Sequence, residues 1–96
     1  MTTQSKTYGR LSKKFKALAH PARLKLLERL AREDCCVSEI EDCLSISQPN
    51  VSQHLKVLKR AGIIQGRRDK RRICYRISDE WVRGLLNTIF SRRRPT

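Results

Sequence analysis

The sequence predicts a mainly α-helical domain with one small β-hairpin near its C-terminal end. Apolar residues recur at helical spacing through most of the chain, and they alternate with a period of two only within residues 63–77. The length of 96 residues leaves room for one domain with a modest core. We therefore expect a single domain over residues 1–96, with a frayed N-terminus at residues 1–6 and a basic tail at residues 91–96.

The first predicted helix covers residues 8–18. One face of it is apolar, at spacing i, i+4 and i+7, through Leu11, Phe15 and Leu18. Pro21 favours the first turn of a second helix, because the N–H group that proline lacks would have no helical acceptor there. His20 precedes this proline, and we expect it to be the N-terminal cap residue.

Two shorter helices follow, separated by a turn at residues 45–47. Ser38 and Glu41 fit a capping box at the start of the third helix. Ser47 is the candidate N-cap of the fourth helix, and Gly62 is well placed to follow its C-terminus. The buried face of the fourth helix is predicted to contain Val51, Leu55 and Leu58.

The predicted hairpin has strands at residues 63–65 and 73–77. On the second strand, alternation predicts one inner face made of Ile73, Tyr75 and Ile77. Asp79 is the candidate N-cap of a last helix. That helix carries a wide apolar stripe of Trp81, Val82, Leu85, Leu86, Ile89 and Phe90.

Two helices joined by about three residues, the second opening with polar side chains, are typical of a helix-turn-helix. In that motif the N-terminal part of the second helix contacts base edges in the major groove of DNA. The polar residues at this place are Gln48, Asn50, Ser52, Gln53 and His54. Lys56 and Lys59 lie further along the helix and are better placed for phosphates. The alternative is an ordinary amphipathic helix with a solvated polar face.

Positive charge is concentrated on the hairpin. Its basic residues are Arg67, Arg68, Lys70, Arg71, Arg72 and Arg76. The whole chain has a formal net charge of +13, which indicates a polyanionic partner, nucleic acid first and an anionic membrane second. A basic hairpin directly after a recognition helix would be a wing that grips the DNA backbone or minor groove. The alternative is a hairpin that its charges keep soluble.

Four stretches of the chain form a recognisable series, namely ALAHPARL at residues 17–24, SQPNVSQHL at 47–55, LKRAGII at 58–64 and YRIS at 75–78. Through these stretches the sequence resembles the ArsR/SmtB family of winged helix-turn-helix repressors. This resemblance implies a homodimer that binds a partly palindromic DNA operator and releases it when an inducer binds. It also implies that Ser52, Gln53 and His54 contact DNA, although His54 could instead pack against the turn or a phosphate.

The resemblance places the homodimer interface on the first and last helices. Burial of apolar surface supports this placement, because the stripe on the last helix is too wide for one small core to cover. The candidate interface residues are Leu11, Phe15, Trp81, Leu85, Leu86 and Ile89. The alternative is that the stripe only closes the core of the monomer.

The cysteines suggest a way to sense an inducer. Cys35, Cys36 and Cys43 are candidate ligands for a thiophilic metal or metalloid such as arsenite, Cd or Zn, because thiolates are soft ligands. The family's arsenic and cadmium sensors have a Cys-Val-Cys segment at this place, whereas here Ser38 occupies the position of the second cysteine. A thiol oxidation switch and plain buried residues are the alternatives. Cys74 has basic neighbours that favour its thiolate, so it could sense oxidants or be a partly buried bystander.

Two other classes of protein are weaker expectations. An architectural or RNA-binding basic module without a defined operator would not need the polar residues at the start of the fourth helix. An enzyme is not expected, because the sequence has no Gly-rich phosphate loop or paired carboxylate motif. The only histidines are His20 and His54, so we expect no metal site on the last helix. The sequence shows no signal peptide or transmembrane segment, and we expect a cytoplasmic protein that does not bind membranes.

Overall fold

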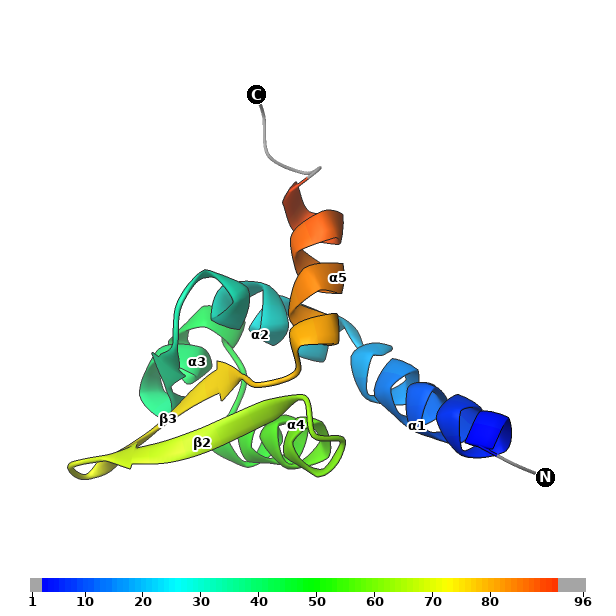
Figure 1. Cartoon of the computed structure of the whole chain (residues 1–96). Helices are drawn as coiled ribbons and strands as arrows, with labels where there is room; N and C mark the ends of the chain where they lie inside the picture. Colours follow the sequence, from blue (N-terminus) through cyan, green and yellow to red (C-terminus); the bar gives the residue numbers. More distant parts are fainter. Residues whose placement is uncertain (1–2, 92–96) are drawn as a thin grey trace.

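The computed structural model describes residues 3–91, which form five helices and three strands (Figure 1). In chain order these elements are α1 (Thr3–Leu18), α2 (Pro21–Arg32), β1 (Cys35–Cys36), α3 (Val37–Leu44), α4 (Gln48–Arg60), β2 (Ile64–Asp69), β3 (Arg72–Ile77) and α5 (Glu80–Ser91). The expected mainly α-helical fold with a small hairpin is confirmed. Helices α3 and α4 are the helix-turn-helix, and β2 and β3 are the wing.

Helix α1 begins earlier than the sequence analysis predicted. Residues 3–6 were expected to be frayed, but they form its first turns. Residues 3–6 contain no proline or glycine, so nothing in this segment stops the helix from extending toward the N-terminus. Residues 1–2 and 92–96 lie outside the described residues, and with them most of the expected basic tail, whereas Ser91 is the last residue of α5.

The starts of α2 and α5 agree with the predicted caps. His20 Nδ1 accepts a hydrogen bond of 3.1 Å from the backbone N–H of Ala22. Asp79 Oδ1 accepts hydrogen bonds from the N–H groups of Trp81, at 3.0 Å, and Val82, at 3.2 Å. Each side chain therefore satisfies N–H groups that the first turn of a helix leaves without an intrahelical acceptor.

The predicted capping box at Ser38 and Glu41 is wrong. The N-cap of α3 is Cys36, and its backbone N–H donates a hydrogen bond of 2.9 Å to the carboxylate of Glu39. The short strand β1 explains the difference, because Cys35 and Cys36 pair with β3 and the helix begins directly after them. This pairing is with residues far along the chain, so a local motif could not reveal it.

Gly62 ends α4 as the sequence predicted. Its φ angle of +75° lies in the left-handed region, which glycine adopts without steric cost. The N–H of Gly62 donates to the carbonyl of Lys59, and the N–H of Ile63 donates to the carbonyl of Leu58, both at 3.0 Å. This pair of bonds is a Schellman motif, and it turns the chain from α4 into the wing.

The three strands form an antiparallel sheet in the order β1-β3-β2. The hairpin is longer than predicted, since its pairing continues from Ile64 with Ile77 as far as Asp69 with Arg72. Lys70, with a φ angle of +61°, lies in the tight turn at its tip. In Figure 1 this tip extends well away from the helices.

The expectation of one shared inner face on β3 is wrong for Ile73. Ile77 is buried and Tyr75 is half-buried, but 41% of Ile73 is exposed. Cys74, expected on the other face, is buried. Strand β1 pairs only with Cys74 and Tyr75, so Ile73 lies beyond it, on the projecting part of the hairpin.

The core lies between the helices and the base of the sheet. Its fully buried members include Leu27 of α2, Ile40 of α3, Leu58 of α4, Ile77 of β3 and Leu86 of α5. The core therefore holds the helix-turn-helix and the base of the wing in one packed unit.

Candidate nucleic-acid interface

Helix α4 presents its polar residues to solvent because its apolar face is buried. Val51, Leu55 and Leu58 are in the core, as predicted. The polar residues that remain exposed on α4 are Gln48, Asn50, Ser52, Gln53, Lys56, Lys59 and Arg60. The burial pattern therefore fixes which side of α4 is free to meet a ligand.

The turn before α4 sets its direction relative to α3. Ser45 closes α3 in the left-handed conformation, with φ of +57°, and its N–H donates a hydrogen bond of 2.9 Å to the carbonyl of Glu41. Ser47 is the N-cap residue of α4, as predicted, although no side-chain hydrogen bond caps the helix. Ile46 packs against the core between them. This short, anchored turn is typical of a helix-turn-helix.

The wing carries an exposed set of cations. The exposed basic side chains around its tip are Arg67, Arg68, Lys70, Arg71 and Arg72. Arg76, nearer the core, donates a hydrogen bond of 3.1 Å to the side-chain oxygen of Gln65 on the neighbouring strand. The density of positive charge on a projecting hairpin suits contact with a polyanion.

Gly66 gives the wing a feature that the sequence analysis missed. A Cβ atom at this position would lie 2.8 Å from Cε1 of Tyr75, which is paired with Gly66 across the hairpin. The glycine therefore leaves room for the tyrosine ring to lie across β2. In hindsight, a lone glycine within a strand is a signal of such a close approach.

Helix α4 and the wing border the same hollow. This hollow, of about 300 Å³, is lined on one side by Gln48, Ser52, Lys56 and Lys59 of α4 and on the other by Ile73 and Tyr75 of β3. The polar face of α4 and the cationic hairpin therefore lie next to each other. One stretch of duplex can meet both surfaces.

His54 lies at the flank of α4, away from the wing. Its half-buried ring is 4.5 Å, between centroids, from the ring of His20 at the start of α2. Burial lowers the pKa of His54, and the neighbouring His20 and Arg23 lower it further. This contact with His20 is not one of the roles that the sequence suggested for His54, whose contact with DNA stays a prediction.

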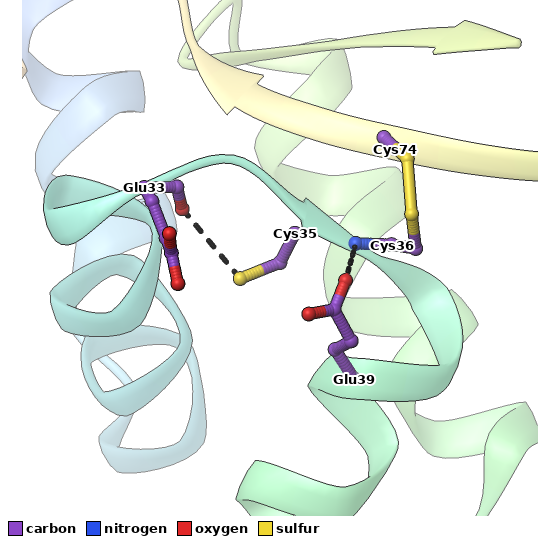
Figure 2. The surroundings of a disulfide bond; sticks show 5 residues. All are labelled: Glu33, Cys35, Cys36, Glu39 and Cys74. Carbon is purple, nitrogen blue, oxygen red and sulfur yellow. Dashed lines mark hydrogen bonds between the residues drawn. A yellow bond between two sulfur atoms is a disulfide. The ribbon is translucent and has the colours of Figure 1, made fainter. Parts of the chain in front are cut away.

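The cysteines are arranged differently from the expected metal site. Cys36 forms a disulfide with Cys74 of β3, and the two Cα atoms are 3.8 Å apart (Figure 2). The side chain of Cys35 points the other way, and its thiol donates a weak hydrogen bond of 3.5 Å to the carbonyl of Glu33 (Figure 2). Within residues 3–91, no three His, Cys, Asp or Glu side chains are grouped so that they could hold a metal ion. The grouping of Cys35, Cys36 and Cys43 as one ligand set is therefore corrected.

The two free cysteines differ in environment. Cys35 is buried and Cys43 is half-buried. Burial raises the pKa of the Cys35 thiol, against the opposing effect of the Arg29 guanidinium, and Glu39 and Glu33 raise it further. Cys35 is therefore held as a thiol.

Helices α1 and α5 meet through aromatic and charged contacts. Phe15 and Trp81 pack edge to face, with ring centroids 5.5 Å apart. Both remain partly exposed, at 51% and 42%, as does Ile89 at 45%. Leu11 and Leu85 are half-buried beside them. These residues leave an apolar face on the described part of the chain.

Leu86 does not belong to this face. It is only 1% exposed and packs in the core of the chain itself. The wide stripe on α5 is therefore divided, with Val82 and Leu86 covered by the core and Trp81 and Ile89 left open. Leu86 is accordingly removed from the candidate interface.

The fold and this surface define a winged helix-turn-helix protein. A family model described as "Bacterial regulatory protein, arsR family" matches residues 20–65. The transcriptional repressor BigR from Xylella fastidiosa has a crystal structure that matches with a TM-score of 0.82 and 32% identity over 100% of both chains. The chain belongs to the ArsR family.

Two further comparisons agree with this assignment. A homodimeric winged helix-turn-helix DNA-binding domain from Mycobacterium bovis, a possible ArsR-family regulator, has a TM-score of 0.86 and 28% identity, over 93% of this chain and 82% of that one. The HTH-type transcriptional repressor SmtB of Mycobacterium tuberculosis is 45% identical over 71 residues, which is 74% of this chain. The chain spans only 53% of the length of that relative. None of the helices in the described part of the chain has the length and hydropathy that a membrane span requires.

Proposed function

We propose that this chain is a sequence-specific DNA-binding transcriptional repressor. The observation that carries the proposal is the shared hollow between α4 and β3, because it places the polar helix face and the basic wing on one surface. Polar side chains such as Gln53 at the start of α4 read base edges in the major groove. The lysines further along α4 and the arginines of the wing contact phosphates, which fix the position of the protein on DNA.

The proposed repressor acts as a homodimer on a partly palindromic operator. The apolar face around Phe15 and Trp81 is the proposed dimer contact, and the similar domain from Mycobacterium bovis is homodimeric. A two-fold axis through this face would place two copies of α4 about 34–36 Å apart, which is one turn of DNA. Operator half-sites are therefore expected at this spacing.

The Cys36–Cys74 disulfide favours a thiol-redox signal for this repressor. It joins the N-cap of α3, in the helix-turn-helix, to strand β3 of the wing. The helix-turn-helix and the wing are the two parts proposed to bind DNA. Oxidation by a hydroperoxide would form the S–S bond and transfer two electrons and both thiol protons to the peroxide, which is thereby reduced to water and an alcohol. In a cytoplasmic protein such a bond is usually transient and used for redox sensing.

Release by a thiophilic ion is the competing proposal for the inducer. In the reduced protein Cys36 and Cys74 are thiols, and the thiolates that form from them on deprotonation are soft ligands for arsenite, Cd or Zn. In both proposals the chain acts in the cytoplasm by binding DNA and catalyses no reaction.

The test begins with a duplex selected by the protein from a random DNA library. Its affinity is measured by fluorescence anisotropy for reduced protein, for peroxide-treated protein, and for reduced protein with arsenite, Cd or Zn. We expect at least a tenfold difference between the reduced and oxidised forms, which Cys36→Ser abolishes and the control Cys43→Ser retains. Selection of no preferred sequence would contradict the repressor proposal. Equal affinity of the reduced and oxidised forms would contradict the redox signal alone.

A further inference from the structure

A second hollow lies on the flank of α4 away from the wing. It has a volume of about 500 Å³, and residues from three helices line it: Lys13, Lys16 and Ala17 of α1, Arg23 of α2, and Val57, Arg60 and Ala61 of α4. We call it the α1–α4 hollow. None of the α1 or α2 residues that line it belongs to the DNA-contacting set proposed above.

The α1–α4 hollow is positively charged and would favour an anionic ligand. Four of its lining residues are basic, namely Lys13, Lys16, Arg23 and Arg60, and none is acidic. Cations gathered in this way repel one another, and the repulsion grows where solvent is partly excluded. The hollow is therefore suited to a ligand that brings negative charge.

Arg23 adds a hydrogen-bonding requirement at the same place. Its Nε atom is buried and has no hydrogen-bond acceptor among the described residues. Leaving a buried donor of a charged group without an acceptor is costly, so native structures usually satisfy such groups. An oxygen of an anionic ligand in the hollow would satisfy it.

The position of the hollow relative to α4 identifies the anion. In Figure 1 the wing extends to one side of α4 and α1 extends to the other. The major groove is about 12 Å wide and a helix with its side chains is about 10–12 Å across, so a helix in the groove has a phosphate backbone close to each flank. The wing can reach only one of these two backbones.

We infer that the α1–α4 hollow binds a backbone phosphate on the side of the major groove opposite the wing. Arg23 donates its Nε–H to a phosphate oxygen, and Lys13, Lys16 and Arg60 surround the charge. This inference rests on the proposed binding of α4 to DNA, and it extends the interface to α1 and α2. The recognition helix would then be held between two phosphate contacts, one on each flank.

The proposed dimer leaves the hollow open. Phe15 points toward Trp81 of α5, and Lys13 is two residues, or about 200°, away around the helix. The face of α1 that carries Lys13 is therefore on the side opposite the apolar face. The same helix can contribute to the dimer with one face and to DNA with the other.

The experiment maps phosphate contacts by ethylation interference on the library-selected duplex. The unmodified protein should show sensitive phosphates on both flanks of each half-site. Lys13→Gln combined with Lys16→Gln should remove sensitivity only on the flank away from the wing, whereas Arg67→Gln should remove it only on the wing flank. Lys25→Gln is the matched control, because Lys25 is an exposed lysine of α2 that does not line the hollow. Both lysines of the hollow are exposed, so their replacement should not unfold the protein.

Salt dependence gives a second readout for Arg23. Arg23→Gln should reduce the slope of log affinity against log salt by about 0.9, the value for one phosphate contact, while Arg23→Lys should restore part of it. An unchanged interference pattern in the lysine variant would overturn the inference. A second result would also overturn the inference. If inorganic phosphate raised the melting temperature of the free protein while the lysine variant kept its DNA contacts, the hollow would hold a free phosphate rather than a DNA phosphate. Failure of the unmodified protein to select any sequence would instead count against the proposed function.

Discussion

Asp79 joins α1 to α5 through the ammonium group of Lys14. Its Oδ2 atom lies 2.7 Å from Nζ of Lys14, while Oδ1 accepts the N–H groups of Trp81 and Val82. Lys14 also lies over the ring of Trp81, with Nζ 5.6 Å from the centroid. One carboxylate therefore caps α5 and fixes the angle at which α1 meets it.

Replacement of Asp79 should make stability less dependent on acid pH. Burial alone would raise the pKa of this carboxyl group, but the Lys14 ammonium and the N–H groups of Val82 and Trp81 outweigh it and lower the pKa. The stabilisation that the Asp79 carboxylate contributes is therefore complete above the pKa that this group has in the unfolded state. It is lost as pH falls through the lower pKa that the group has in the folded state. Asp79→Ala should lower the free energy of unfolding near neutral pH by about 1 kcal/mol, the usual cost of losing a cap. Urea denaturation at several pH values measures this, and parallel pH profiles of the two proteins would contradict it.

Removing wing charge should weaken DNA binding mainly at low salt. The triple variant Arg67→Ala, Arg68→Ala and Arg71→Ala should reduce the slope of log affinity against log salt by about 0.9 for each phosphate that the wing no longer binds. The three side chains are exposed, so the fold should be retained. Lys25→Ala serves as the charge control, and a slope change as large in this control would argue for a nonspecific charge effect.

Loss of Gln53 should change sequence preference more than total affinity. This side chain is exposed on α4, where it can donate to and accept from the edge of a base. Gln53→Ala should weaken the free energy of binding to the selected operator by about 1–3 kcal/mol. The loss should be much smaller on a duplex altered at the contacted base pair. Binding is compared across a set of single-base operator variants, with Lys59→Ala expected to weaken all of them alike.

Reduction of the Cys36–Cys74 bond should destabilise the protein. The bond links residues 38 positions apart, and closing a loop of this length contributes about 4 kcal/mol through chain entropy. Reductant should therefore lower the denaturation midpoint of the unmodified protein. Cys74→Ser should already show the lower midpoint and should not respond to reductant, while Cys43→Ser should behave like the unmodified protein.

A charge on the apolar face should dissociate the proposed dimer. Trp81→Glu places a carboxylate beside Phe15, on a face that should be dry in the dimer. Sedimentation should then show a monomer at concentrations where the unmodified protein is dimeric. Glu80→Gln, at an exposed neighbour, is the control. A dimer that survives Trp81→Glu would place the interface elsewhere.

Features that depend on a few neighbouring residues could be predicted from the sequence. The caps at His20 and Asp79 and the left-handed Gly62 each act within a few residues of their own position. The apolar face of α4 was predictable because its period directly reflects helical geometry. These local signals were sufficient to place the recognition helix and the wing.

Features that depend on distant pairing could not be predicted in this way. Strand β1, the start of α3 at Cys36 and the disulfide to Cys74 all follow from contact with β3. Leu86 shows a related limit, because an apolar stripe does not reveal whether the chain's own core or a second copy covers it. The α1–α4 hollow brings together side chains of three helices, and no spacing along the chain indicates it.

The Cys36–Cys74 bond turns residues 36–74 into a covalent ring that contains α3, α4 and the tip of the wing. Helices α1 and α2 are attached to this ring at Cys36, and α5 is attached at Cys74. These two residues are neighbours across strands β1 and β3. A protease that cuts the peptide bond after Arg71, at the exposed tip, would therefore release no fragment from the oxidised protein. The two pieces would separate on a denaturing gel only after reduction, so a digest limited to this single cut, run with and without reductant, reports directly on the redox state of the chain.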